Sequence, residues 1–349
     1  MDIILIPDIF LCVVALLWLV YASITDLRKR EVANWVSLSL IFIALIIRSI
    51  VAVMLGQNIL IVLGFVVLFL LFFYLFVKEK ALWIQIVGAA ILVAAGFLSK
   101  SFNTFGSIDY LSTGFIAFGI IFIISVLAFY GKVFGGADAK ILMALAFIFA
   151  TTPSFLNFTY FLPVDLLGLS LSNSSFLVDF IINSLLISVV YGLVFSGIIA
   201  LRNRKKFSLK FKEVNSKLKI FKVVLLIIGI IFLVLGVFQR ILIIPAVLII
   251  ILPWFYAFIK GVEQGVLVSY KSGKDLQEGD WLVEKTTVEK RVLKPSAEGL
   301  SKEDILLIKR SGKQVLIRDG VAYIPVFLLS VVVSLLLGNL FLRILMLLI

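Results

Sequence analysis

The chain has 349 residues, of which 62% are hydrophobic and only 15% are charged, and its mean hydropathy is +1.21. A soluble globular protein is about 45–50% apolar and about 25% charged, so this composition excludes that class and indicates a polytopic membrane protein. The chain has no histidine and a single cysteine, Cys12. These counts exclude a histidine-based triad, histidine metal ligands, paired-cysteine metal sites and an intrachain disulfide. Any chemistry must come from carboxylates, lysines or hydroxyls.

The apolar segments predict the architecture. A spanning helix needs about 20 mainly apolar residues. Hydropathy indicates about nine or ten such helices, of which the first lies at residues 4–22 and the last at residues 321–342. The predicted fold class is therefore an all-α polytopic membrane protein with one small cytoplasmic α+β insert. The predicted parts are a transmembrane body at 1–259, a soluble cytoplasmic domain at 260–320, and a C-terminal transmembrane helix within 321–349.

The insert is the one polar region, with ten acidic and twelve basic residues between positions 260 and 320. Alternating apolar and polar residues at 265–270 and 314–318 predict strands, separated by turn signals such as Ser311-Gly312. The segment 302–309 has acids first and apolar residues after, and predicts one or two helical turns. Its size is near the limit for independent folding, so we expect it to lean on the membrane body or the membrane surface.

The net charge is +12, and the positions of the basic residues indicate which side of the membrane each segment faces. Basic residues follow the first span at positions 28–30, and nine lie in 202–222 against one acid, Glu213. The positive-inside rule then places the N-terminus outside, and these segments and the insert on the cytoplasmic side. A nucleic-acid-binding patch at 202–222 is the alternative. A cytoplasmic loop attracted to anionic lipid headgroups explains the same charges, so the lipid membrane is the expected partner and nucleic acid is not.

Carboxylates in or beside a span are expensive and suggest function by default. Only ten acids lie outside the insert, and most fall at external ends or in charged loops. Asp8, preceded by Pro7, either has a functional role or marks the start of a helix. Asp26 and Asp138 stand out, because both fall at span ends predicted to be cytoplasmic. Four predicted spans separate them, so both carboxylates return to the same membrane face.

Each of these two aspartates also has a structural explanation. Asp26 can pair with the basic residues at 28–30. Asp138 can cap a helix that opens the apolar run 141–145, because an acid there interacts favourably with the helix dipole. The small residues 135–137 before Asp138 would permit close approach of another backbone.

The two motifs together resemble the type IV prepilin peptidases, and the archaeal branch with the preflagellin peptidases is most similar. These enzymes belong to the GxGD class of intramembrane aspartyl proteases. In that class one aspartate follows a span in a D-x-basic…N context, and a second closes a Gly-x-Gly/Ala-Asp motif. The resemblance implies that Asp26 and Asp138 are catalytic. Supporting motif residues are Asn34, Gly135, Gly136, Ala137 and Lys140. Segments 276–280 and 320–329 are similar to the archaeal C-terminal extension of the family.

The chain departs from the family pattern in three places. Ala137 replaces the second glycine of the nominal motif, a position where archaeal members have small residues. An additional helix pair at about 58–98 separates the aspartates. A helix pair keeps both aspartates on the same membrane face, so the mechanism of the family can still apply. The local packing of the family cannot be transferred to this chain. Cys12 alone cannot supply the paired CxxC zinc motifs of the bifunctional bacterial enzymes, so no N-methyltransferase activity is expected.

Two carboxylates can hydrolyse a peptide without a cofactor or a metal. We therefore expect this protein to use no cofactor and no metal. One ionised carboxylate acts as a general base on water while the other, protonated, polarises the scissile carbonyl. Their pKa values split as a coupled pair. The resemblance implies a membrane aspartyl endopeptidase that removes the short basic leader, a class III signal peptide, from type IV prepilin-like or archaellin (preflagellin) precursors at the cytoplasmic membrane face.

Two other function classes remain open. A proton- or ion-coupled transporter also uses intramembrane acids, and it predicts acids near the bilayer midplane with broken helices in corresponding halves. A scaffold for pilus assembly predicts that both aspartates are dispensable. The sequence leaves open the oligomeric state and whether Asp26 and Asp138 touch in the resting protein.

Overall fold

The computed structural model describes residues 3–78, 82–101, 109–156, 175–239, 242–289, 291–296 and 298–348. Within these residues, seven helices are long and apolar enough to cross a membrane. Strands occur only in a small region near the C-terminal end of the described chain. The predicted class, an all-α polytopic protein with a small strand-containing insert, is therefore confirmed.

The chain divides into two compact units. The first unit comprises residues 1–189 and 321–349, and the second comprises residues 190–320. Residues 190–259 group with the insert in the second unit. Hydropathy locates apolar helices but carries no information on which helices pack together. The division into a membrane body at 1–259, a cytoplasmic domain at 260–320 and a C-terminal transmembrane helix stays a prediction.

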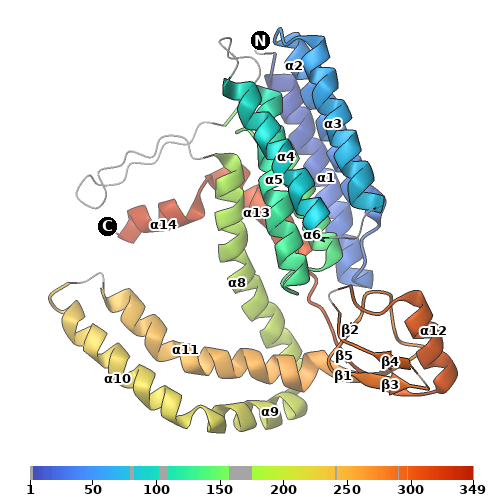
Figure 1. Cartoon of the computed structure of the whole chain (residues 1–349). Coiled ribbons are helices and arrows are strands. Elements are labelled where there is room, and N and C mark those ends of the chain that lie inside the picture. The colour runs from blue at the N-terminus through green and yellow to red at the C-terminus, as the bar shows by residue number, and fades with distance from the viewer. Residues whose placement is uncertain are drawn as a thin grey trace. The chain divides into compact units, whose positions relative to one another are not determined.

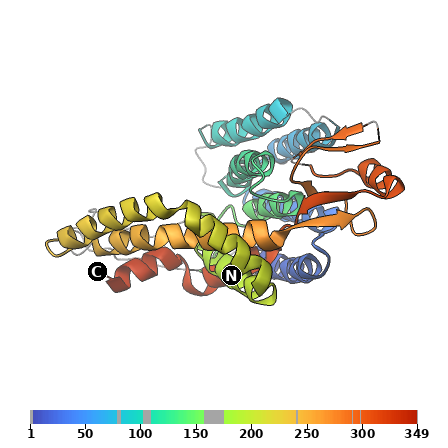
Figure 2. The ribbon, with the colours of Figure 1, turned by 90° about the horizontal axis from the view of Figure 1, so that it is seen from below.

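The first unit is a bundle in which the helices between residues 5 and 130 lie side by side in Figure 1 and are foreshortened in Figure 2, whereas the last helix, at 340–348, runs across them. Its helices are α1 (Leu5–Lys29), α2 (Asn34–Met54), α3 (Ile59–Lys78), α4 (Leu82–Ser101), α5 (Asp109–Tyr130), α6 (Gly136–Ile148), the first part of α8 (Phe176–Arg202), α13 (Ile324–Leu337) and α14 (Leu340–Leu348). Helix α6 has only 13 residues, and every residue from Ile141 to Ala150 is buried. It is therefore the central helix of the unit.

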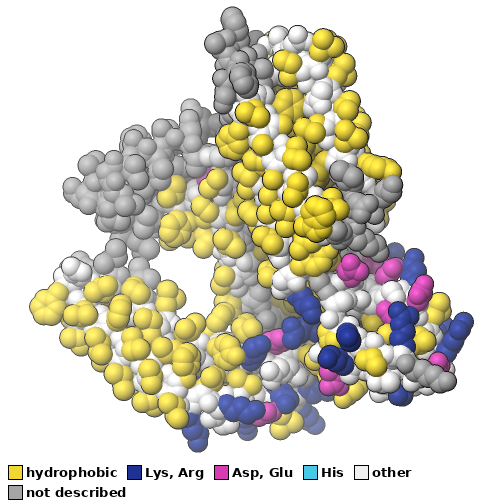
Figure 3. Space-filling model, viewed as in Figure 1, with side chains coloured by type: hydrophobic (Ala, Val, Ile, Leu, Met, Phe, Trp, Pro, Cys, Tyr) yellow, Lys and Arg dark blue, Asp and Glu magenta, His cyan; other side chains and the backbone are white. Residues whose placement is uncertain are grey.

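Large apolar side chains also cover the outside of this bundle (Figure 3). Leu60 on α3 is 72% exposed and Trp83 on α4 is 68% exposed. A soluble protein rarely exposes a continuous apolar surface of this kind, because contact with water is unfavourable. Contact with lipid removes that cost, so the surface agrees with a membrane-embedded bundle.

The C-terminal segment forms two helices, whereas the sequence predicted one spanning helix. Gly338, between α13 and α14, has a φ of 65°, which favours glycine and ends α13. The buried Asn183 side chain of α8 donates to the Gly338 carbonyl at 2.7 Å and accepts from the Leu340 N–H at 2.9 Å. These hydrogen bonds satisfy backbone groups that the break leaves without helical partners.

The second unit contains α9 (Arg204–Lys217), α10 (Lys219–Gly236) and α11 (Ile243–Val262). The basic segment predicted to be a loop is therefore largely helical. No side chain of α9 is buried, and its one acid, Glu213, lies 2.7 Å from the Lys210 amine and 2.9 Å from the Lys217 amine. Hydrogen bonds from these two lysines lower the pKa of Glu213 to about 2. Spacings of three and four residues on a helix favour such pairs.

The insert continues from α11 through a π-helical turn, η2 (Glu263–Leu267). Its strands are β1 (Val268–Ser272), β2 (Trp281–Leu282), β3 (Thr286–Val288), β4 (Arg291–Leu293) and β5 (Gln314–Arg318). One antiparallel sheet has the order β1-β5-β2, and β3 and β4 form a separate hairpin. Its small core includes Val288, Ile308 and Ile317, each fully buried. The predicted strand at 314–318 is confirmed.

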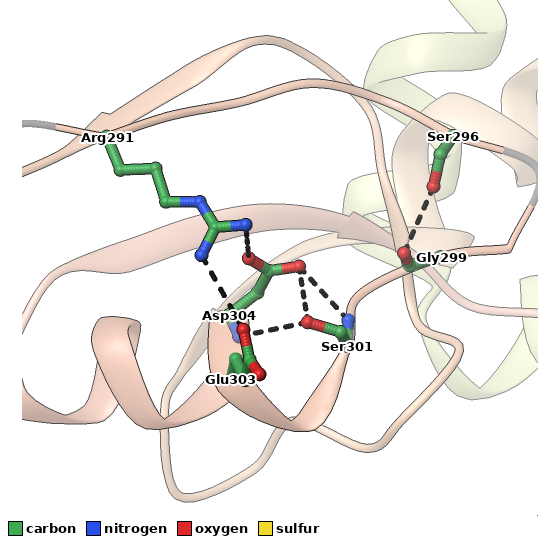
Figure 4. A network of polar contacts seen from close by, with 6 residues as sticks. All are labelled: Arg291, Ser296, Gly299, Ser301, Glu303 and Asp304. Atoms are coloured by element: carbon green, nitrogen blue, oxygen red, sulfur yellow. Dashed lines mark hydrogen bonds and ion pairs between the residues drawn. The ribbon is translucent and has the colours of Figure 1, made fainter.

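Helix α12 (Lys302–Ser311) also confirms the predicted helical segment of the insert and extends it slightly. Ser301 caps its first turn: the Asp304 N–H donates to the Ser301 hydroxyl at 3.2 Å. The Asp304 carboxylate in turn accepts from the Ser301 hydroxyl and faces Arg291, at 3.6 Å (Figure 4). This capping box fixes the start of α12 and joins it to the β3–β4 hairpin.

Gly299 is the tightest backbone position in the insert. Its φ is 75°, and a Cβ atom there would lie 2.2 Å from the Gly279 carbonyl oxygen. Gly299→Ala is therefore expected to destabilise the insert by about 3 kcal/mol or more, because backbone strain and a clash add. Gly312 also has a positive φ but open space around it, so Gly312→Ala should cost only about 1 kcal/mol.

Limited proteolysis of the full-length protein measures this difference. The insert of the Gly299→Ala variant should be cleaved fastest, that of Gly312→Ala more slowly, and that of the unchanged chain slowest. Equal cleavage of the two variants would contradict the proposed clash.

Candidate active site

Asp26 lies in the last turn of α1 with only 7% of its surface exposed. Helix α1 ends at Arg30, whose left-handed conformation lets its N–H donate to the Asp26 carbonyl at 2.8 Å. A different segment of the chain holds the Asp26 side chain. Its carboxylate oxygen accepts the backbone N–H of Ile324 at 3.1 Å, and it also interacts with the Tyr323 backbone. Asp26 is thus buried by its own helix and oriented by a second segment.

That second segment is the start of α13, where Tyr323 is the N-cap and Pro325 is in the first turn. The first N–H groups of a helix have no partner within the helix, and the helix dipole favours negative charge there. The Asp26 carboxylate therefore occupies a position that stabilises an anion. Arg30 also interacts electrostatically with Asp26, in line with the pairing that the sequence suggested.

Asp138 lies in the first turn of α6. Gly135 is the N-cap of α6, and its backbone N–H donates to the Asp138 carboxylate at 3.0 Å. A Cβ atom at Gly135 would lie 3.1 Å from the same carboxylate oxygen. The glycine thus makes room for the carboxylate itself, whereas the sequence suggested the approach of another backbone.

The two aspartates belong to the same unit and lie close enough for the charge of Asp26 to act on the Asp138 carboxyl group. Aromatic contacts join their surroundings: the Phe134 ring lies 5.4 Å from the Tyr323 ring and 6.2 Å from the Phe327 ring. The residue before the glycine motif therefore packs on the start of α13, whose backbone holds Asp26. All of these residues belong to the first unit.

Lys140 and Asn34 are also brought together. The Lys140 amine donates to the Asn34 side-chain oxygen at 2.7 Å, and this contact joins the first turns of α6 and α2. Both side chains line a pocket of about 270 Å³, whose other lining residues are mostly apolar side chains of α2, α3, α5 and α6. Gly136 and Ala137 are half-buried and serve as backbone of the first α6 turn.

One group near the site, Tyr323, carried no individual prediction from the sequence. Tyr323 is half-buried, hydrogen-bonded to Ser188, and close enough to Asp138 to interact electrostatically with it. A phenol ionises only at about pH 10, so the Tyr323 hydroxyl is protonated at neutral pH and can donate a hydrogen bond. Its position two residues before Pro325 indicates a helix start, but that signal alone does not reveal which carboxylate lies near it.

The side chains present do not suggest a metal site. Within the described ranges, no three carboxylate, cysteine or histidine side chains group together as metal ligands would. The arrangement offers two carboxylates, a protonated phenol and helix N-termini, which is a set suited to acid–base chemistry.

Residues 13–89 match the model of the type IV leader peptidase family. The match confirms the resemblance to type IV leader peptidases. The matched segment includes Asp26 and Asn34, extends through α3 into α4, and ends before the segment that carries Asp138. Neither a curated protein nor a solved structure matches the chain.

Type IV leader peptidases are aspartic-type peptidases that act on precursor proteins, and the match supports a function of this broad kind. The apolar helices add a multi-pass association with a membrane.

Proposed function

We propose that this chain is a membrane aspartyl endopeptidase with Asp26 and Asp138 as its catalytic residues. It removes the short basic leader from type IV prepilin-like or preflagellin precursors at the cytoplasmic face of the cell membrane. The observation that carries the proposal is that two carboxylates 112 residues apart in the sequence lie at helix ends of one compact unit, where each accepts a backbone N–H. The family match over the first of them supports it.

The chemistry requires one carboxylate ionised and the other protonated. The ionised group takes a proton from a water molecule, whose oxygen attacks the carbonyl carbon of the scissile bond. The protonated group gives its proton to the carbonyl oxygen, so a neutral tetrahedral diol forms. The diol then collapses: the carboxyl group that took the water proton gives it to the peptide nitrogen, the other carboxylate takes a proton from a diol hydroxyl, and the C–N bond breaks. Both carboxyl groups thereby return to their starting protonation states.

The contacts of Asp26 and Asp138 fit this division of labour. Each carboxylate has backbone donors in place: Asp26 accepts from Ile324 and also interacts with the Tyr323 backbone, and Asp138 accepts from Gly135. Each keeps lone pairs for a water molecule or a substrate group, since a carboxylate has about four acceptor positions. The protonated Tyr323 hydroxyl is a further donor at the edge of the pair.

The positions of the acids also separate this proposal from a transporter. A coupled transporter needs ionisable groups near the bilayer midplane. Asp26 and Asp138 instead lie in a last and a first helical turn. The other buried acid on α1, Asp8, is already bound to Tyr110 and to the Ser154 backbone. This arrangement supports hydrolysis at a membrane face.

Cleavage by the purified full-length protein in liposomes tests the proposal. The substrate is a synthetic precursor peptide with a basic leader followed by an apolar helix. Mass spectrometry is expected to show cleavage at the junction of leader and helix. The double variant Asp26→Asn/Asp138→Asn, prepared in parallel, is expected to release no leader, which excludes a contaminating peptidase. A chelator and a thiol-alkylating reagent should leave the rate unchanged. No cleavage at that junction, or equal cleavage by the double variant, would refute the proposal.

A further inference from the structure

Arg48 is the most unusual charged residue of the membrane bundle. It lies in α2 with 0% of its surface exposed. A charged side chain inside a membrane protein is costly and is retained only where specific partners compensate it. The partners of Arg48 therefore indicate what the residue is for.

Most of its hydrogen bonds go to the end of α6. The guanidinium Nε donates to the Phe147 carbonyl at 2.7 Å, and Nη2 donates to the Ile148 carbonyl at 2.9 Å. Nη2 also reaches the Thr151 hydroxyl at 3.1 Å. The last carbonyls of a helix lack partners within the helix, and here they are surrounded by buried residues that exclude water. Arg48 satisfies these carbonyls, and its positive charge suits the C-terminal end of the helix dipole.

Arg48 is itself fixed by a second set of contacts. Its Nη1 donates to the Tyr110 carbonyl at 2.7 Å, and its guanidinium carbon lies 4.4 Å from the centre of the Tyr110 ring. The Tyr110 hydroxyl donates to one Asp8 carboxylate oxygen at 2.7 Å, and the Ser154 N–H donates to the other at 2.7 Å. A continuous chain of contacts thus links α1, α5, α2 and the end of α6, with one negative charge to balance the positive one.

Helix α6 is consequently held against α2 at both ends. Lys140 contacts Asn34 at its first turn, and Arg48 contacts Phe147 and Ile148 at its last. Asp138 lies ten residues before Ile148, which corresponds to about 15 Å along the helix axis. A helix of this length moves as a unit, so a shift at its C-terminal end displaces Asp138 by a similar amount.

We propose that Arg48 is a positioning residue for the peptidase reaction, which acts through α6 to set the distance between Asp138 and Asp26. This inference rests on the proposed function. The planar guanidinium reaches the Tyr110, Phe147 and Ile148 carbonyls at once because its donors point in fixed, divergent directions. A lysine amine keeps the charge but presents its donors from one atom, so it cannot hold all of these carbonyls.

Arg48→Lys in the full-length protein tests this role. Val51→Ala is the matched control, because Val51 lies three residues further along α2 and is equally buried. Both variants are expected to lower the melting temperature. Arg48→Lys should also lower kcat for leader cleavage by about ten- to a hundredfold, since small displacements of catalytic groups have effects of this size, and should leave KM within about twofold. Val51→Ala should leave both kinetic constants nearly unchanged.

A distance measurement that does not depend on activity completes the test. Asp26→Cys and Asp138→Cys are combined in a Cys12→Ala background and cross-linked with a short bis-maleimide. Adding Arg48→Lys is expected to lower the cross-link yield, whereas adding Val51→Ala should not. An unchanged yield and an unchanged kcat in Arg48→Lys would overturn the positioning role. If the unchanged chain cleaves no precursor, the proposed function fails, yet the cross-link yield still decides whether Arg48 positions α6.

Discussion

Asp26→Asn and Asp138→Asn are each expected to lower kcat for leader removal by about a hundred- to ten-thousandfold, the usual contribution of a general acid or base. Asparagine is nearly the same size as aspartate, but it can neither take nor give the proton that the reaction moves. Substrate binding does not depend on that proton, so KM should change little. Single-turnover cleavage in liposomes, followed on a gel, measures the effect.

The contacts of the two aspartates indicate that this loss of activity comes from the missing proton transfer and not from unfolding. The side-chain oxygen of an asparagine can still accept the Ile324 N–H at position 26, or the Gly135 N–H at position 138. Neither substitution therefore leaves a backbone donor unpaired, and both variants should stay folded. A fall in activity without a fall in melting temperature is the expected signature.

Asp179→Asn is the matched control for these variants. Asp179 is 3% exposed, lies on α8, and accepts a hydrogen bond from Asn339 at 2.8 Å. The control changes the same group in a buried place outside the proposed catalytic pair. It should keep nearly full activity. Full processing by either catalytic-site variant would disprove the two-aspartate mechanism.

The sequence predicted much of the fold because the signals are local. Runs of apolar residues gave the spanning helices, and alternation with a Ser-Gly turn gave the strand at 314–318 and the helix before it. Asp26 and Asp138 can be identified as candidate site residues because few acidic residues lie near the predicted spans. Both lie in a terminal helical turn, and their catalytic role stays a prediction.

Contacts between distant segments were beyond the reach of the sequence. Ile324 donates to Asp26 across 298 residues, and Arg48 reaches the end of α6 across about 100 residues. Hydrophobic periodicity does not show which backbone groups a helix end leaves unpaired, so nothing marked Arg48 as their partner. The basic segment 202–222 was interpreted as a loop from its charge alone. Its helix α9 is instead supported by pairs such as Glu213 with Lys217.

The second prediction concerns the counter-charge of Arg48. Asp8→Ala is expected to lower the free energy of unfolding by about 3–5 kcal/mol, because removing one partner leaves a buried charge uncompensated. It also leaves the Tyr110 hydroxyl and the Ser154 N–H without their acceptor. Asp8→Asn keeps an acceptor for one of these donors and loses only the charge, so its cost should be smaller, about 1–3 kcal/mol. Equilibrium unfolding in mixed micelles measures both values.

Glu31→Ala, at an exposed position just after α1, should stay within about 0.5 kcal/mol of the unchanged chain. A loss for Asp8→Ala no larger than that would contradict the role of Asp8 in holding Arg48. Asp8 and Arg48 act on each other through Tyr110, so their effects should not add. The double variant Asp8→Ala/Arg48→Lys is expected to lose less stability than the two single losses combined, because each substitution already weakens the contact that the other removes. Additive losses would mean that Asp8 and Arg48 stabilise the bundle independently, and that α6 is held by Arg48 alone.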